Sequence, residues 1–141
     1  MISTLSQLIA QAEGRNRAAA VRFEPAFKPS DLAVTRCAKA NECTQATARI
    51  ICAMSFGKYQ MMGENIYGGF GFQDPIAVFM NLDSMQDAGF AWFVQSHNIN
   101  YTLADMVNNQ IAREHFGKVY NGNGPVYAAY LMQVLKDTNH V

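Results

Sequence analysis

The sequence predicts a mainly α-helical single domain over residues 1–141, with at most a very short β element. Apolar residues recur at helical spacing in several segments. Threonine, aspartate or asparagine stands at the start of each such segment, where N-caps are expected. No pair of alternating apolar and polar runs has the pattern of a β-hairpin. With 141 residues, half of them hydrophobic, the chain is long enough to bury a sizeable core.

The first half of the chain contains two predicted helices. The first begins after Thr4 in a capping-box pattern and ends at Gly14. The second begins after Thr44 and continues to about Met54. Between them, residues 23–41 contain two prolines and show no sustained apolar period, which predicts a loop with at most one helical turn.

The second half is predicted to be helical almost throughout. An aspartate followed by proline marks the next helix start, and a later loop rich in asparagine and glycine precedes the last helix. The expected helical segments are 74–96 with a break near 83–84, a short segment after Thr102, and a segment from Asn108 to about Tyr120. A final helix is expected after the loop 121–125. The apolar stripe of this final helix contains Tyr127, Tyr130, Leu131, Val134 and Leu135. The glycine-rich stretch 66–72 is the place for a short extended piece.

Charge and cysteine content exclude several classes of protein. Eleven basic residues balance eleven acidic ones, so nothing favours nucleic acid or an anionic membrane as a partner. No apolar run is long enough for membrane insertion. The spacing of Cys37, Cys43 and Cys52 matches neither a disulfide framework nor a zinc site, so we expect reduced thiols, no metal and no cofactor. The N-terminus has no basic region or cleavage site of a signal peptide, so any export is expected to use another route.

Glu13 occupies an unusual position for an acid. It lies on the apolar face of the first helix, eight residues after Leu5 and four after Ile9, and at the negative end of the helix dipole. Burial and the dipole should both raise its pKa. A glutamic acid that stays protonated is what glycosidic bond cleavage requires. The alternative is a side chain that bends into water or pairs with Arg15 or Arg17.

Four segments, in this order, carry recognisable motifs: EGRNRAAAVRFE over 13–24, SFGKYQMMG over 55–63, an aromatic helix over 85–95, and YNG over 120–122. Together they resemble the lysozyme-like superfamily, in particular its soluble lytic transglycosylases and endolysin-type phage N-acetylmuramidases. The resemblance covers most of the chain. It implies that the chain degrades peptidoglycan, and that its fold is that of a lysozyme.

The resemblance also implies which residues form the site. Glu13 would be the catalytic acid, and the substrate-binding residues would be Ser55, Gln60, Tyr120 and Asn121. Gln60 offers both a donor and an acceptor to a saccharide, and Tyr120 would hydrogen-bond the catalytic carboxyl or the substrate. The alternatives are a helix-surface amide for Gln60, a buried aromatic for Tyr120, and a cap before a glycine turn for Ser55.

Glu24 is a supporting or rival carboxylate. It matches the F-E-x-H-x-F piece of the muramidases, except that Ala26 stands where histidine is common. Two further departures concern the acid motif, with Gly14 where the family often has serine and Arg17 where it often has proline. Such changes could accompany lost catalysis.

The expected reaction is cleavage of the β-1,4 bond between N-acetylmuramic acid and N-acetylglucosamine, with Glu13 as acid and then base. No second acid stands in an evident paired motif, which favours a lytic transglycosylase over a hydrolytic muramidase. The alternative is a non-catalytic structural component of a virion or a glycan-binding module. The expected partners are the peptidoglycan glycan strand and, in a particle, other virion proteins. A phage product of this kind would leave the host cytoplasm through a holin, or travel in the virion, and act in the periplasm or cell wall.

Overall fold

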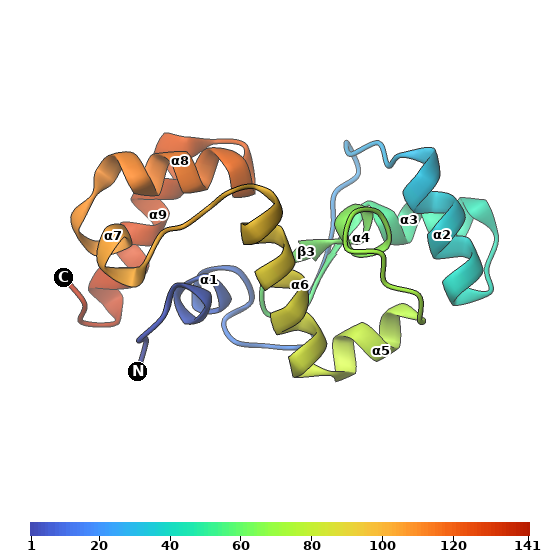
Figure 1. Ribbon diagram of the computed structural model, residues 1–141, viewed down its shortest axis with the longest axis horizontal. Coiled ribbons are helices and arrows are strands. Elements are labelled where there is room, and N and C mark those ends of the chain that lie inside the picture. Colours follow the sequence, from blue (N-terminus) through green and yellow to red (C-terminus); the bar gives the residue numbers. More distant parts are fainter.

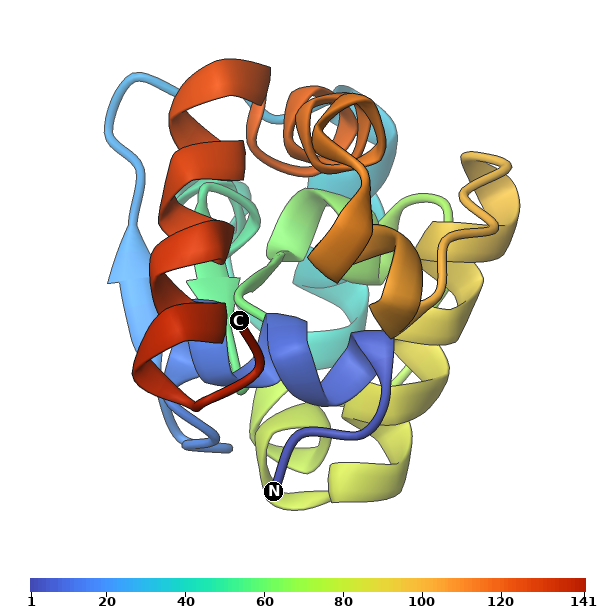
Figure 2. The same cartoon turned by 90° about the vertical axis from the view of Figure 1, so that its left-hand side faces the viewer.

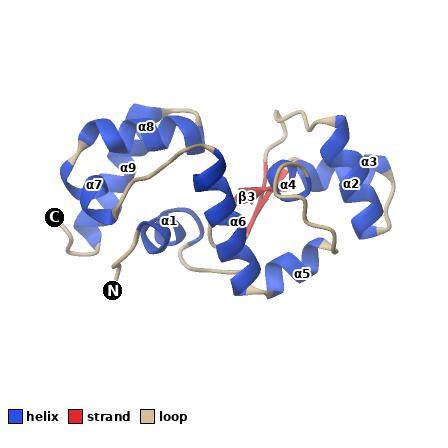
Figure 3. Ribbon diagram, in the orientation of Figure 1, coloured by secondary structure: helices blue, strands red, loops and turns tan.

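A computed structural model describes residues 1–141, and most of them are helical (Figure 3). The helices are α1 (Leu5–Gly14), α2 (Asp31–Asn41), α3 (Gln45–Cys52), α4 (Gly63–Tyr67), α5 (Ile76–Asn81), α6 (Asp83–Ser96), α7 (Leu103–Asn108), α8 (Gln110–Asn121) and α9 (Gly124–Asp137), and the strands are β1 (Val21–Phe23), β2 (Met54–Phe56) and β3 (Met61–Met62). The mainly α class with a short β element is confirmed. No helix is both long and apolar enough to cross a membrane.

The buried side chains form two hydrophobic clusters with α6 between them (Figure 1). The terminal cluster, which includes Leu8, Phe116 and Leu131, is enclosed by α1 and by α7, α8 and α9. The middle cluster, which includes Ile66 and Phe79, lies among α2 to α5 and the sheet. Trp92 of α6 packs against both clusters. Helix α6 therefore packs against both groups of helices.

The two ends of the chain meet in the terminal cluster. Helices α1 (blue) and α9 (red) lie side by side, as the rotated view in Figure 2 shows. His140 donates a hydrogen bond from Nε2 to the carbonyl oxygen of Ile2 at 2.6 Å. The N-terminal helix is thus held in place by the last helix of the chain.

The small sheet is antiparallel in the order β1-β2-β3 and lies against α4 (Figure 3). Its register pairs Arg22 with Ser55 and Ser55 with Met62. Residues paired across neighbouring strands project from the same face of a sheet. These three side chains therefore form one row.

The predicted helices are largely confirmed. The Thr4 side chain caps α1 by accepting a hydrogen bond from the backbone N–H of Gln7 at 3.2 Å. The Thr44 side chain caps α3 by accepting from the backbone N–H of Thr47 at 3.2 Å. The predicted break near 83–84 is real, since α5 ends at Asn81 and α6 begins at Asp83. Helix α8 starts one residue later than predicted, because its cap is the asparagine after the predicted one.

The prediction of a loop over 23–41 is wrong for its second half. Ser30 caps α2 by accepting from the Ala33 amide at 3.2 Å, and Ala33, Val34 and Cys37 are buried on one face. The prolines stand before the cap, where they do not interrupt a helix. Because α2 has only one narrow apolar face, its apolar period is weak, and the two prolines led to the prediction of a loop.

The strands could not be predicted. Each has two or three residues, which is too short for alternation to be visible. The stretch 66–72 is not extended; α4 ends within it at Tyr67.

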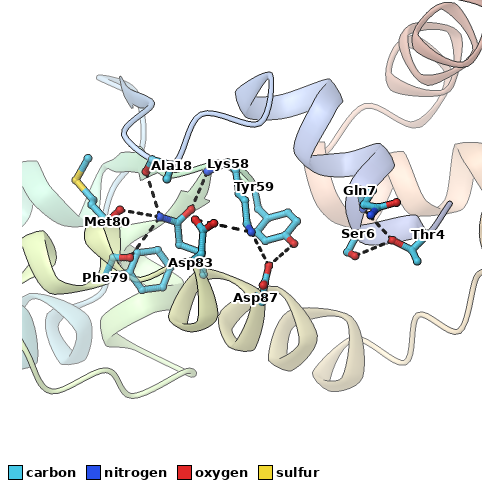
Figure 4. A network of polar contacts seen from close by, with 11 residues as sticks. Thr4, Ser6, Gln7, Ala18, Lys58, Tyr59, Phe79, Met80, Asp83 and Asp87 are labelled. Carbon is cyan, nitrogen blue, oxygen red and sulfur yellow. Dashed lines mark hydrogen bonds and ion pairs between the residues drawn. The ribbon is translucent and has the colours of Figure 1, made fainter. Parts of the chain in front are cut away.

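Gln86 is the buried polar residue on which the loops around the sheet depend. Its side chain, 1% exposed, projects from α6. The amide oxygen accepts from the Lys58 backbone N–H at 2.9 Å, and the amide nitrogen donates to the carbonyl oxygens of Ala18 at 3.1 Å and Met80 at 3.0 Å. Figure 4 shows these contacts together with those of Asp87, which binds Lys58 Nζ at 2.8 Å. One side chain thus connects three segments.

Gly57 lies directly against this amide. Its φ of +81° is in the left-handed region, and a Cβ atom added there would be 2.3 Å from Oε1 of Gln86. Both its backbone conformation and its close packing therefore favour glycine.

We expect the substitution Gln86→Ala to lower the free energy of unfolding by about 2–4 kcal/mol, because it removes the partner of the partly buried backbone groups of Ala18, Lys58 and Met80. Urea denaturation of the wild type and the variant measures the change. The matched control is Gln95→Ala, an exposed position on the same helix, which should change stability by less than about 0.5 kcal/mol. Equal effects of the two substitutions would show that the Gln86 network does not hold these loops.

Candidate active site

An open cleft of about 480 Å³ lies at the C-terminal end of α1. Its wall is formed by the end of α1, the sheet, the loop after β1, the turn between β2 and β3, and the end of α8. The lining residues are Glu13, Arg22, Glu24, Ala26, Phe27, Ser55, Gln60, Met62, Tyr120 and Asn121. All six residues that the sequence predicts for the site are among them, although they are spread over more than 100 positions of the chain.

Glu13 is half-buried in the last turn of α1. Burial raises the pKa of its carboxyl, and this effect exceeds two opposing ones, a hydrogen bond from Tyr127 and the positive charge of Arg22. The expected direction of the pKa shift is confirmed. The alternative partners Arg15 and Arg17 are both exposed and form no ion pair with Glu13.

Tyr127 is the direct partner of the acid. Its hydroxyl, from the buried face of α9, donates to Oε1 of Glu13. The sequence places Tyr127 on the apolar stripe of the last helix but has no signal that aims it at Glu13. Only the packing of α9 against α1 brings the two side chains together.

Gly14 lets the helix end approach the opposite wall. A Cβ atom added to it would lie 2.6 Å from both Cα and the carbonyl oxygen of Lys58. A serine at this position would push α1 away from the turn that contains Gln60. The departure from the motif of the resembled family therefore has a steric reason in this chain.

Gln60 is not a helix-surface amide. It lies in the turn between β2 and β3 with a φ of +51°, and its Nε2 donates to the carbonyl oxygens of Gly57 at 2.9 Å and Ala20 at 3.2 Å. Its Oε1 accepts no hydrogen bond from the protein. The side chain is thus fixed at the cleft wall with an acceptor still free.

Tyr120 has a different hydrogen-bond partner from the predicted one. Its hydroxyl donates to the carbonyl oxygen of Tyr59, not to Glu13, and its ring packs edge-on against Phe93 at 5.2 Å between centroids. Burial raises its pKa well above the ordinary value, so the hydroxyl keeps its proton. The neighbouring Asn121 is exposed at the end of α8.

Ser55 contributes little surface to the cleft. It is 2% exposed and lies in β2, where its Oγ donates to the thioether sulfur of Met62 at 3.1 Å. It is therefore not a helix cap.

Glu24 is held by Arg22. The Nε atom of Arg22 lies 2.6 Å from Oε1 of Glu24, and both residues line the cleft. Because Arg22 also lowers the pKa of Glu13 through its charge, one cation acts on both carboxyl groups of the site.

A second hollow, of about 790 Å³, is larger but contains none of the predicted site residues. It lies between α2 and the loop 71–75, and oppositely charged side chains such as Arg36 and Glu42 line it. Nowhere in the chain do three or more His, Cys, Asp or Glu side chains gather as metal ligands would.

A mainly helical fold with a small sheet, and a carboxyl group of raised pKa in an open cleft, is consistent with a lysozyme-like domain. The chain is 31% identical over 139 aligned residues to the endolysin of Enterobacteria phage PRD1, and the alignment covers 92% of this chain and 93% of that protein. The chain therefore belongs to the phage endolysin family. No family model matches the chain, and no solved structure matches it.

The raised pKa of Glu13 makes stability depend on pH in a defined direction. Between the pKa of free glutamate and that of Glu13, the folded protein binds more protons than the unfolded chain. This contribution to stability is full below about pH 4 and is lost as the pH rises through the pKa of Glu13. We expect Glu13→Gln to abolish this loss, so that the variant is more stable than the wild type at neutral pH.

Thermal unfolding of both proteins from pH 4 to pH 8 tests this expectation. Subtracting the two curves isolates Glu13, because all other groups titrate in both proteins. A difference that is constant with pH, or that favours the wild type as the pH rises, would mean that the carboxyl is not destabilised by burial.

Proposed function

We propose that this chain degrades peptidoglycan by cleaving the β-1,4 bond between N-acetylmuramic acid and N-acetylglucosamine, with Glu13 as the general acid. Membership of the phage endolysin family supports a phage-encoded protein that degrades the cell wall. The single observation that supports the chemistry is the position of Glu13, which is half-buried, has a raised pKa and lies in an open cleft.

The first step follows from the properties of this carboxyl. Protonated Glu13 donates its proton to the glycosidic oxygen while the bond from that oxygen to the sugar C1 breaks, and the bonding electrons stay with the oxygen. The leaving sugar therefore departs as an alcohol. Glu13 is left as a carboxylate, which the Tyr127 hydrogen bond and the Arg22 charge stabilise.

The second step replaces the lost bond at C1. The preference for a transglycosylase drawn from the sequence depends on the lack of a second carboxylate, but Glu24 lines the same cleft as Glu13. We therefore propose hydrolysis, in which water attacks C1 and Glu24 accepts its proton. The ion pair with Arg22 holds Glu24 at the cleft wall for this role.

The substrate is proposed to be the glycan strand, bound by the fixed amide of Gln60 and by Asn121. The free Oε1 atom of Gln60 can accept hydrogen bonds, and the Asn121 amide can both donate and accept them, as the hydroxyl and acetamido groups of amino sugars require. We further propose that Tyr120 contacts a sugar of the bound strand. We also propose that the protein reaches the wall by holin-dependent release or as part of the virion. The alternative, a non-catalytic virion component or glycan-binding module, would bind sacculi without turnover.

We expect Glu13→Gln to reduce the turnover of purified peptidoglycan by at least about 100-fold, the scale of a lost general acid. The matched control, Glu42→Gln, changes an exposed glutamate outside the cleft and should leave turnover unchanged. In the wild type the rate should fall as the pH rises through the pKa of Glu13. A variant within about tenfold of the wild type, or about 1.4 kcal/mol of barrier, would exclude Glu13 as the acid.

Mass spectrometry of the released muropeptides distinguishes hydrolysis from transglycosylation. We expect reducing muramic acid ends, and we expect Glu24→Gln to lower turnover by about 100-fold or more while sacculus binding is retained. A digest of anhydro ends, which lack one water, would instead show that a hydroxyl of the substrate attacks C1. Turnover would then be insensitive to Glu24→Gln.

A further inference from the structure

A groove of about 470 Å³, distinct from the 790 Å³ hollow described above, lies behind one wall of the cleft that contains Glu13. Its apolar surface comes from Phe23, Pro25, Phe27 and Ile50, and the three large side chains among them are 49%, 40% and 53% exposed. Apolar side chains that are exposed together in one groove often mark a binding site.

The segment 22–27 separates the groove from the cleft. Arg22, Glu24 and Ala26 line the cleft, whereas the residues between them, Phe23 and Pro25, line the groove. In β1 this follows from strand geometry, since successive side chains point to opposite sides. The segment is anchored by a hydrogen bond from the Glu24 amide to the Ala53 carbonyl at 2.9 Å. It is therefore a thin wall with the cleft on one side and the groove on the other.

Phe27 lines both spaces, so the groove and the cleft border each other at this residue. A group attached to a sugar in the cleft would reach the groove if it extended past Phe27.

The groove is basic although the chain as a whole has no net charge. Its charged residues are Lys28 and Arg49, and no acid lines it. Lys28 forms no ion pair, and Arg49 has only a distant one with Asp31, at 3.6 Å, whose side chain is 94% exposed. Both cations are thus available to carboxylate groups of a ligand.

We propose that this groove binds the peptide stem of peptidoglycan, and this inference rests on the proposed cleavage of the glycan strand in the cleft. The stem is attached to the lactyl group of muramic acid, so it must leave the cleft over one of its walls. It contains short apolar side chains and free carboxylates, which match the apolar surface and the two cations. The groove would make the protein prefer glycan strands that bear stems.

The double variant Lys28→Ala/Arg49→Ala tests the proposal without disturbing the core, because both residues are exposed. The substrates are glycan strands with intact stems and the same strands after an amidase has removed the stems. We expect KM on stem-bearing strands to rise about tenfold with kcat unchanged, and no change on stem-free strands. The control Lys39→Ala/Lys136→Ala removes the same charge from exposed positions outside the groove and should behave as the wild type.

A direct binding measurement keeps this test separate from that of the proposed function. The free tripeptide L-alanyl-γ-D-glutamyl-diaminopimelate, titrated into the wild type and followed by NMR, should shift the amide signals of 23–28 and 49–53. The double variant should not show these shifts. If the wild type cleaves neither substrate, the proposed function fails, whereas tripeptide binding still supports the groove.

Three results would overturn the inference. The first is an unchanged KM on stem-bearing strands together with no tripeptide binding. The second is an equal loss on both substrates, which would mean that the groove binds the glycan itself. The third is weaker binding of the double variant to phosphatidylglycerol vesicles with unchanged turnover of stem-bearing strands, which would make the groove a membrane contact.

Discussion

The acid character of the cleft depends on the burial of the Glu13 carboxyl at the end of α1, because withdrawal from water raises the pKa of this group. A carboxyl in this position costs stability whenever it ionises. The surrounding structure limits that cost with the Tyr127 hydroxyl and the Arg22 charge, but these do not cancel the effect of burial. The balance leaves an acid that holds its proton more strongly than a glutamate in water.

This balance requires that α1 be fixed from both sides. On one side α9 supplies Tyr127, and the hydrogen bond between His140 and Ile2 joins the two ends of the chain. On the other side Gly14 lies directly against the backbone of Lys58, which the Gln86 amide holds. Helix α6, which contains Gln86 and packs against both hydrophobic clusters, therefore connects the wall opposite the acid to the rest of the fold.

The short sheet has a role out of proportion to its size. Its row of Arg22, Ser55 and Met62 forms part of the cleft, and the segment that continues β1 brings Glu24 beside Arg22. The same segment turns Phe23 and Pro25 to the other side, toward the basic groove. The cleft and the groove thus share one strand and the loop after it. A thin wall of this kind is what the proposed binding of one substrate on both sides, by its sugar and by its peptide, requires.

Apolar spacing and N-caps are local properties of the chain, and they were enough to predict the mainly α class, most helix boundaries and Glu13 as the candidate acid. It did not reveal α2, whose start follows two prolines, or strands too short to show a period. The hydroxyl that donates to Glu13 belongs to Tyr127 and not to Tyr120, and Glu24 lies in the same cleft as the acid. These are contacts between residues far apart in the chain, and they depend on how helices and strands pack, which no local spacing encodes.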